Sequence, residues 1–326
     1  MELTKKRVAW ITVVLTVVFF IPLLYLPESI VGDRPDNFLL FFPRILFFAI
    51  TAAITTIFIL LFIFRRDYIS GQLFAFSRYK HYMALMIKRD LVSRYRKSIL
   101  GILWSMLNPL LTMLIMTAVF SQLFGVDTPH FAVYVFSGQL ILNFFTEATS
   151  GAMVSIFHNE GVIKKIYVPK YIFPLNKIVT ASVNMGFVFI PFLLILLFSG
   201  IEFSWTQLLI PIPVIYTFVF SLGIGMLVSS LAVFYRDITH LWGVLMTLLF
   251  FMTPIMYPIE IIPEWLVPFY WFNPMVHFVE YFRQVAMLGT VPSLWANMVC
   301  IGFALSSLCI GTYVFMSKQD KYILNM

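Results

Sequence analysis

The sequence predicts an all-α polytopic membrane protein with about eight transmembrane helices, since one crossing takes roughly 20 apolar residues. Of its 326 residues, 61% are hydrophobic and only 11% are charged, whereas soluble domains carry about 25% charged residues. The basic residues lie between the apolar runs, which is the pattern of membrane topology and not of a nucleic-acid-binding face. No long stretch has the composition of a soluble catalytic domain.

The apolar runs and the charges beside them predict how the chain crosses the membrane. With both termini in the cytoplasm, 19 of the 22 lysines and arginines face inward, as the positive-inside rule requires. The first run is longer than the apolar core of a signal peptide, so we expect it to be a retained span. The runs cover residues 8–26, 38–64, 102–124, 131–157, 175–199, 208–234, 239–257 and 297–316.

Residues 66–97 carry too many charges to form a span. On a helix they have one apolar face and one basic face, although Leu85 and Val92 intrude on the basic side. This pattern predicts an amphipathic interfacial helix on the cytoplasmic surface. The helix can rest on anionic lipid or dock a soluble partner, and both alternatives stay open. Its apolar face contains Phe76, Tyr79, Met83, Met86 and Ile87.

The stretch RYRKSILGILWSMLNPLL at residues 94–111 joins three basic residues to an apolar run that contains a proline. We expect Arg94, Arg96 and Lys97 to anchor the elbow where the chain enters the membrane from the cytoplasm. Pro109 lacks the amide hydrogen that would bond the carbonyl of Ser105, so it predicts a kink in this span.

Glu147 is the clearest ionisable residue at membrane depth, where a carboxylate is a candidate functional group. It can line a polar pathway, or it can be neutral and bonded to a hydroxyl such as that of Thr146 or Ser150. Glu280 and Arg283 are three residues apart, so they can pair on one helix face. Contact with an anionic substrate is the alternative for this second pair.

Five prolines interrupt the apolar segment 251–274 and exclude one continuous helix. Broken backbone at membrane depth must be buried in protein or line a wet cavity. We therefore expect a span that ends near Tyr257, followed by two short helices that dip back from the outer face. An outer loop lying on the membrane interface is the alternative.

Aromatic residues make up 18% of the chain and supply large, rigid faces. Such faces stack on sugar rings, so a pathway for a glycan would favour them, although most of the phenylalanines must face lipid. Together with Glu147, the candidates for lining a channel are Phe120, Phe124, Phe144, Phe145, Phe251, Tyr257 and Tyr270.

The chain lacks motifs that would supply energy or chemistry by themselves. No glycine is followed by lysine, which excludes a P-loop, and no histidine is followed by glutamate, which excludes a His-Glu-x-x-His zinc site. We expect no catalytic residue, no metal site and no cofactor in this chain. Energy for any work must come from a partner or an ion gradient.

Several motifs follow one another in a specific order. RDLVSRYRKSILGILWSMLNPLL at residues 89–111 closely resembles the entry signature of the permease subunits of polysaccharide-exporting ABC transporters, which move O-antigen, teichoic acid and capsular polymers. The resemblance covers about residues 78–317. It continues through FSGQLILNFF (136–145), NEGVIKKIYVPKYIFPL (159–175), FYRDITHL (234–241), PIMYP (254–258) and NPM (273–275).

This resemblance implies a function. Such a permease pairs with a second copy of itself and with two separate cytoplasmic ATPase subunits, which hold ATP and magnesium. It would move an undecaprenyl-diphosphate-linked polysaccharide across the bacterial cytoplasmic membrane, in contact with membrane lipids and without nucleic acid. Three other functions stay open: an ABC exporter of a small lipid or drug, an ion-coupled carrier and a membrane-embedded glycan transferase.

The resemblance also implies a division of the chain and roles for some residues. The divisions that it implies are an interfacial helix that seats the ATPase (66–97), a six-span exporter core (98–317) and a cytoplasmic tail (318–326). The additional two-span segment (1–65) departs from the family, whose core starts near the interfacial helix. Within the core lie a coupling helix (158–168) and outer gate helices (258–272). The residues expected to contact the ATPase are Glu160, Lys164, Lys165, Tyr167, Arg78, His81 and Arg89. The basic cluster Arg94, Arg96 and Lys97 would also attract the substrate diphosphate. The residues expected in the outer gate are Pro258, Glu260, Pro263, Trp265 and Pro268.

Overall fold

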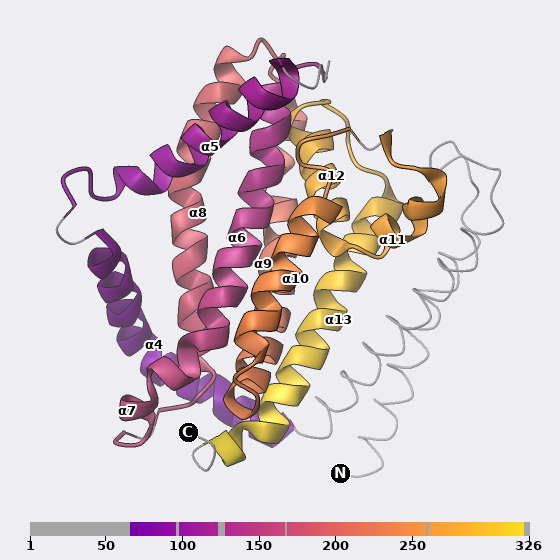
Figure 1. The fold of residues 1–326 in the computed structure, drawn as a ribbon. Coiled ribbons are helices and arrows are strands. Elements are labelled where there is room, and N and C mark those ends of the chain that lie inside the picture. The colour runs from indigo at the N-terminus through magenta and orange to yellow at the C-terminus, as the bar shows by residue number, and fades with distance from the viewer. Residues whose placement is uncertain (1–65, 96–97, 123–127, 167, 259–260, 323–326) are drawn as a thin grey trace.

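A computed structural model gives the fold and describes residues 66–95, 98–122, 128–166, 168–258 and 261–322 (Figure 1). The two spans predicted within residues 1–65 lie outside the described residues. In the described ranges every regular element is a helix, and five helices are long and apolar enough to cross a membrane. The prediction of an all-α polytopic membrane protein is confirmed, while the number of crossings in the whole chain stays a prediction.

The five long helices begin and end within three residues of the predicted spans. The elements are α4 (Arg66–Tyr95), α5 (Leu103–Gln122), α6 (Phe131–His158), α7 (Glu160–Ile163), α8 (Ile172–Phe198), η1 (Trp205–Leu209), α9 (Pro211–Phe234), α10 (Ile238–Met252), η3 (Glu264–Leu266), α11 (Val267–Trp271), α12 (Pro274–Ala286), α13 (Leu294–Lys318) and η4 (Gln319–Lys321).

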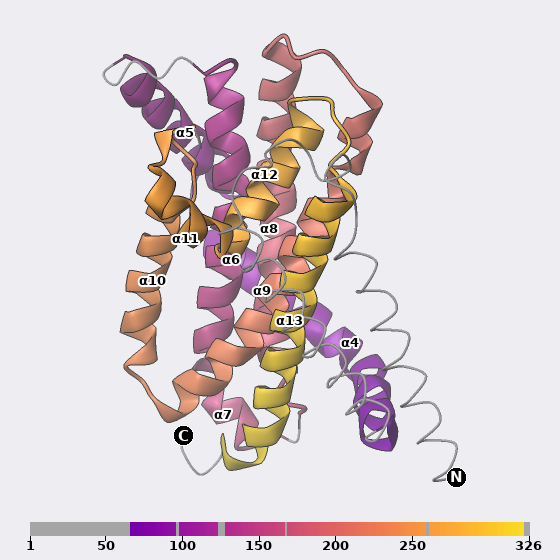
Figure 2. The same ribbon diagram turned by 90° about the vertical axis from the view of Figure 1, so that its right-hand side faces the viewer.

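Helices α6, α8, α9 and α13 form the centre of the bundle (Figures 1 and 2). Helix α6 packs against both α8 and α9, and it buries large apolar side chains such as Phe136, Ile141 and Phe145. Helices α9 and α13 approach each other through the small residues Gly223 and Gly311. Helix α5 packs on the outside of α6 and α8 and leaves most of its apolar side chains exposed, as expected of a lipid-facing helix.

Helix α10 stands at the edge of the bundle (Figure 2) and ends at Met252, five residues before the predicted end near Tyr257. The prediction of this end was wrong because the chain leaves the helix before Pro254 and not after it. Thr253 has extended backbone angles, φ −103° and ψ 127°, as expected of a residue that precedes proline. The short helices η3 and α11 follow within 258–272, where the prolines predict short elements.

A buried arginine holds this broken segment against the bundle. Arg283 of α12 donates hydrogen bonds to the carbonyl oxygens of Pro254 (2.7 Å) and Tyr134 (3.0 Å) and to Oγ of Ser137 (3.3 Å). Its guanidinium also lies 3.4 Å from the ring centroid of Tyr134. Arg283 is only 3% exposed, so its contacts join α12, α6 and the turn after α10 and do not face a substrate.

Helix α4 is anchored at the end of the bundle that carries α7. Met86 is buried there, and Tyr79, Tyr82 and Met83 pack with it against a cluster that includes Ile163 of α7. The predicted apolar face of this helix therefore contacts protein. From the lower end of the molecule, α4 rises along one side of the bundle (Figure 1).

Candidate functional site

A polar cavity of about 650 Å³ lies between α5, α6 and α8, three of the helices that can span a membrane. Arg94 at the end of α4 closes one side of it. Nine of its fifteen lining residues have a polar or charged side chain, and two have aromatic rings. The lining residues are Arg94, Trp104, Ser105, Asn108, Pro109, Thr112, Leu140, Asn143, Phe144, Thr146, Glu147, Ser150, Asn184, Met185 and Val188.

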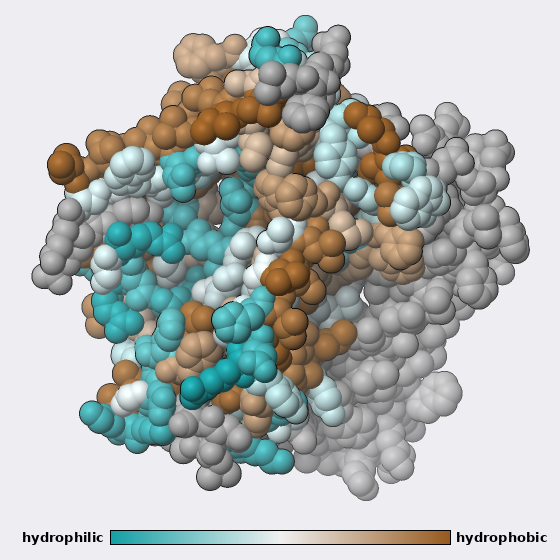
Figure 3. Space-filling model, in the orientation of Figure 1, coloured by the Kyte–Doolittle hydropathy of each residue, from teal (hydrophilic) through white to brown (hydrophobic). Residues whose placement is uncertain are grey.

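The polarity of this region is visible on the surface. In Figure 3, hydrophilic residues gather on the left of the molecule, directly below the hydrophobic band of α5. A polar patch beside spanning helices is costly in lipid unless the side chains pair with each other or face water. The first condition is met in the cavity, where Arg94 and Glu147 form an ion pair.

Local sequence explains why α5 presents polar groups to the cavity. Pro109 lies inside the helix, so the Ser105 carbonyl receives no helical hydrogen bond from residue 109. The hydroxyl of Ser105 donates instead to the Ile102 carbonyl (2.6 Å), and that of Thr112 donates to the Asn108 carbonyl (2.9 Å). Ser105 and Thr112 therefore line the cavity on either side of Pro109.

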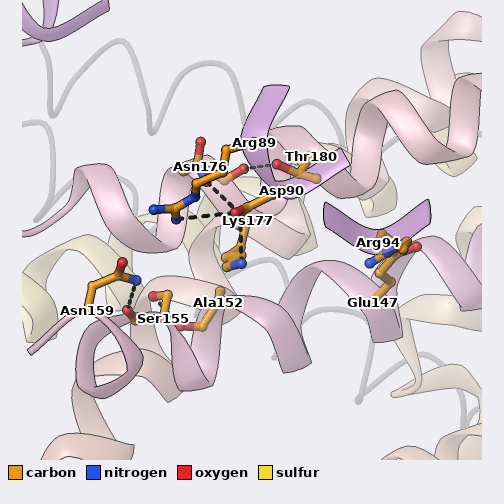
Figure 4. A network of polar contacts seen from close by, with 10 residues as sticks. All are labelled: Arg89, Asp90, Arg94, Glu147, Ala152, Ser155, Asn159, Asn176, Lys177 and Thr180. Carbon is orange, nitrogen blue, oxygen red and sulfur yellow. Dashed lines mark hydrogen bonds and ion pairs between the residues drawn. The ribbon is translucent and has the colours of Figure 1, made fainter. Parts of the chain in front are cut away.

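The cavity contains an ion pair that joins α4 to α6. Nη1 of Arg94 lies 2.5 Å from Oε1 of Glu147 (Figure 4). Nδ2 of Asn184 on α8 donates to Oε2 of Glu147 at 2.7 Å. The alternative in which Glu147 bonds only a neighbouring hydroxyl is therefore wrong. Glu147 lies 11 residues before the end of α6, which is roughly 16 Å along the helix.

Arg94, the one member of the basic cluster that the structure describes, is held against α6 by this pair, and its role as elbow anchor stays a prediction. The C-terminal end of α4 passes beside the middle of α6, because the carboxylate of Glu147 supplies a partner for the guanidinium there. Arg96 and Lys97, the other members of the basic cluster, lie outside the described residues. Their roles as anchor and diphosphate contact stay predictions.

A second ion pair fixes α4 one helical turn earlier. Oδ2 of Asp90 accepts hydrogen bonds from Nζ of Lys177 (2.7 Å) and from Nδ2 of Asn176 (3.2 Å), both on α8 (Figure 4). Gly151 of α6 leaves room for the stem of Lys177, since a Cβ added there would lie 3.4 Å from the Lys177 Cβ. Helix α4 is thus tied to α8 by Asp90 and to α6 by Arg94.

The predicted channel residues occupy different places. Phe144 and Glu147 line the cavity. Phe145 is buried between the rings of Phe220 and Trp242, and Phe120 packs partly buried against the core. The remaining candidates lie elsewhere: Phe251 is exposed on α10, the hydroxyls of Tyr257 and Tyr270 are 2.7 Å apart near the outer prolines, and Phe124 is outside the described residues.

The residues predicted to contact the ATPase belong to α4 and to the segment around α7. Helix α7 covers only Glu160–Ile163, in the middle of the predicted coupling helix. Glu160 pairs with Lys164 at 2.5 Å, while Lys165 and His81 are exposed. Arg89 is exposed and contacts Asp90 at 3.3 Å. Tyr167 and the side chain of Arg78 lie outside the described residues, so the predicted docking surface stays a prediction.

The predicted outer gate lies around the short helices. The carbonyl of Pro263 accepts a hydrogen bond from the Leu266 amide (2.9 Å), which begins η3, and Trp265 is exposed. The carbonyl of Pro258 accepts one from the Ile261 amide (3.3 Å). Glu260 and the side chain of Pro268 lie outside the described residues. In the described ranges, no group of three or more His, Cys, Asp or Glu residues is placed to hold a metal ion.

These features define a class: a multi-pass helical membrane protein with a charged cavity among its spanning helices. The family model for the ABC-2 type transporter matches residues 82–287. This range is more than half of the chain, and the protein belongs to that family.

Characterised relatives with similar sequences extend the comparison. The chain is 26% identical over 251 residues to the O-antigen export system permease protein RfbA of Myxococcus xanthus, covering 75% of this chain and 95% of the relative. It is 28% identical over 249 residues to an RfbA of Klebsiella pneumoniae, covering 74% and 93%. It is 23% identical over 242 residues to the polysialic acid transport protein KpsM of Escherichia coli, covering 72% and 92%.

Proposed function

We propose that this chain is the transmembrane subunit of an ATP-driven exporter of a cell-surface polysaccharide, such as an O-antigen, a teichoic acid or a capsular polymer. The observation that carries the proposal is the charged and amide-lined cavity between α5, α6 and α8 in a chain of the ABC-2 family. Hydroxyl-rich substrates suit such a wall, because amides, carboxylates and guanidinium groups all bond hydroxyls. The names of the relatives point to the same substrate class.

The working assembly in this proposal contains two copies of the chain and two cytoplasmic ATPase subunits. It lies in the bacterial cytoplasmic membrane with both termini in the cytoplasm, and its substrate is linked to undecaprenyl diphosphate. The ATPases hold ATP and magnesium, and they push on α4 and α7. The packing of both elements in one buried cluster with Met86 and Ile163 supports this route, since movement of either disturbs the other.

Competing functions fit the cavity less well. A proton-coupled carrier needs a relay of titrating groups across the membrane, but the Glu147 carboxylate is held between Arg94 and Asn184. A membrane-embedded transferase needs paired acidic or metal-binding groups at one interface. An ABC exporter of a small lipid or drug would use the same ATPase subunits, and it would differ in the substrate that stimulates their ATP hydrolysis.

The first test is purification of the tagged chain from its own membranes in mild detergent, with mass spectrometry of the proteins that accompany it. An ATPase at one-to-one stoichiometry is the expected result. A folded chain that comes alone, even after cross-linking, would contradict the motor-driven mechanism.

A matched pair of substitutions tests the cavity. Thr112 of α5 lines it and Thr247 of α10 does not, yet each hydroxyl is exposed and donates to the carbonyl four residues earlier. We expect T112L to lower the amount of surface polysaccharide strongly and T247L to leave it near the wild-type level, at equal protein levels. If both variants export equally, the cavity is not part of the substrate path.

A further inference from the structure

The two ion pairs on α4 differ in a way that suggests a switch. Asp90 has two donors on α8 and its side chain is only 13% exposed. Arg94, one turn later, is 43% exposed and borders the cavity. Its partner Glu147 has a second donor in Asn184. Separating Arg94 from Glu147 therefore leaves the carboxylate hydrogen-bonded, while the Asp90 contacts still hold α4 to α8.

We propose that the Arg94–Glu147 pair is a lock that an anionic phosphate headgroup opens from within the cavity. The headgroup takes Arg94 from Glu147 and so frees the C-terminal end of α4 from α6, with Asp90 and Lys177 as the pivot. This inference rests on the proposed function, because it assigns the sensed cargo to the exporter's cavity and the signal to the helix expected to seat the ATPase.

The physical basis is competition between two anions for one guanidinium. Arginine binds phosphate and carboxylate through the same donors, and two anions crowded on one cation repel each other. A headgroup consequently binds more tightly when Arg94 and Glu147 are separated than when they are paired. This difference in affinity shifts the equilibrium toward the separated state. By linkage, a motor that pulls α4 away from α6 raises the affinity of the cavity for the anion.

The cavity has the dimensions and donors that a headgroup needs. Its volume of about 650 Å³ lies within the usual range of small-molecule sites, roughly 300–1,000 Å³, so it holds a headgroup together with only a small part of an attached polymer. Asn108 and Asn143 line it beside Arg94 and have amide groups that can donate to phosphate oxygens. The site thus suits the charged end of a lipid-linked substrate.

The test measures the position of α4 in the full-length chain, placed in nanodiscs of neutral phosphatidylcholine. Spin labels are attached to cysteines at Val92 on α4 and Leu197 on α8, both exposed, while the native Cys300 and Cys309 are buried. The distance between the labels is recorded with geranylgeranyl diphosphate, with uncharged geranylgeraniol and with inorganic pyrophosphate. Binding of the diphosphate is measured in parallel.

We expect geranylgeranyl diphosphate to shift the distance and geranylgeraniol to leave it unchanged. E147Q should show the shifted distance without any probe and bind the diphosphate about tenfold more tightly, because loss of one charge-assisted hydrogen bond is worth about that factor. K177M, which breaks the pivot, should not tighten binding. A shift by pyrophosphate alone would support the lock and assign the anion to a soluble phosphate.

A second variant keeps the test decisive if E147Q folds poorly. R94E/E147R restores an ion pair with the cation on α6, so the resting distance should return; because the guanidinium still lines the cavity, the diphosphate should again compete with the carboxylate and shift the distance. Binding of the diphosphate to the wild-type chain without a shift, a shift by geranylgeraniol, or unchanged affinity in E147Q would each overturn the proposal. None of these measurements uses a polysaccharide, so the lock and the proposed function can fail independently.

Discussion

Gly223 on α9 and Gly311 on α13 lie in direct backbone contact. A Cβ added to Gly311 would come within 1.9 Å of the Gly223 carbonyl oxygen, and one added to Gly223 would come within 2.2 Å of the Ser307 carbonyl carbon. In lipid, such close approach between small residues supplies the packing that holds helices together. This helix pair is therefore sensitive to any added volume.

We expect G311A to destabilise the folded protein by about 1–3 kcal/mol or more, because backbone atoms cannot move aside as a flexible side chain can. Thermal unfolding in detergent, followed by size-exclusion chromatography with fluorescence detection, measures the effect. G243A on α10 is the control, since a Cβ there meets nothing within 4 Å. Equal melting temperatures for the two variants would refute this account of the α9–α13 contact.

Replacement of Arg283 should loosen the segment after α10. R283M removes the charged donor from the carbonyls of Pro254 and Tyr134, which keep hydrogen bonds from the hydroxyls of Tyr134 (3.3 Å) and Ser137 (2.8 Å). Each charged hydrogen bond that is lost costs about 1.5–3 kcal/mol. R283K keeps the charge but loses the planar fork, so an intermediate loss is expected. Hydrogen exchange of residues 253–273 reports the loosening. R236M removes an exposed arginine and should leave this exchange unchanged.

Asp90 and Lys177 should show a measurable coupling energy. Their side chains are 13% and 28% exposed and lie 2.7 Å apart, so solvent screens the pair less than a surface ion pair. A double-mutant cycle with D90N and K177M should give a coupling of about 0.5–3 kcal/mol in the free energy of unfolding. Additive effects of the two substitutions would show that α4 is held to α8 by other contacts.

Tyr322 should anchor the end of α13 to the segment that precedes α8. Its ring is buried against Phe315 and Phe234, and nearby Lys170 donates to the Gln319 carbonyl at 2.5 Å. Truncation of a buried aromatic residue costs about 3–5 kcal/mol, so Y322A should raise hydrogen exchange in residues 168–175. Y313A, which truncates an exposed tyrosine, is the matched control. The prediction fails if both variants exchange alike.

Much of the fold was predictable because membrane spans are encoded locally. Long apolar runs and their flanking lysines and arginines mark each helix, and the described spans agree with them to within three residues. The end of α10 was missed because five more apolar residues follow it, and hydropathy does not register the effect of Pro254 on the residue before it.

The site was predictable only in part, for a different reason. Glu147 could be identified from its charge within an apolar run, and such a carboxylate calls for a partner. Its partner Arg94 is 53 positions away and Lys177 is 87 positions from Asp90, so helix periodicity does not connect them. A search for unpaired opposite charges on neighbouring segments could have proposed both pairs. The Arg283 contacts go to backbone carbonyls, for which sequence carries no signal.

Those carbonyl contacts bear on how this part of the chain can evolve. Every residue carries a backbone carbonyl, so the acceptors that Arg283 uses at Pro254 and Tyr134 survive many side-chain changes there. Arg283 itself cannot be replaced in the same way, because no other side chain presents the same fork of N–H groups. Mutational scanning should thus find that Arg283 tolerates no substitution, whereas Pro254 tolerates changes that keep its carbonyl in place.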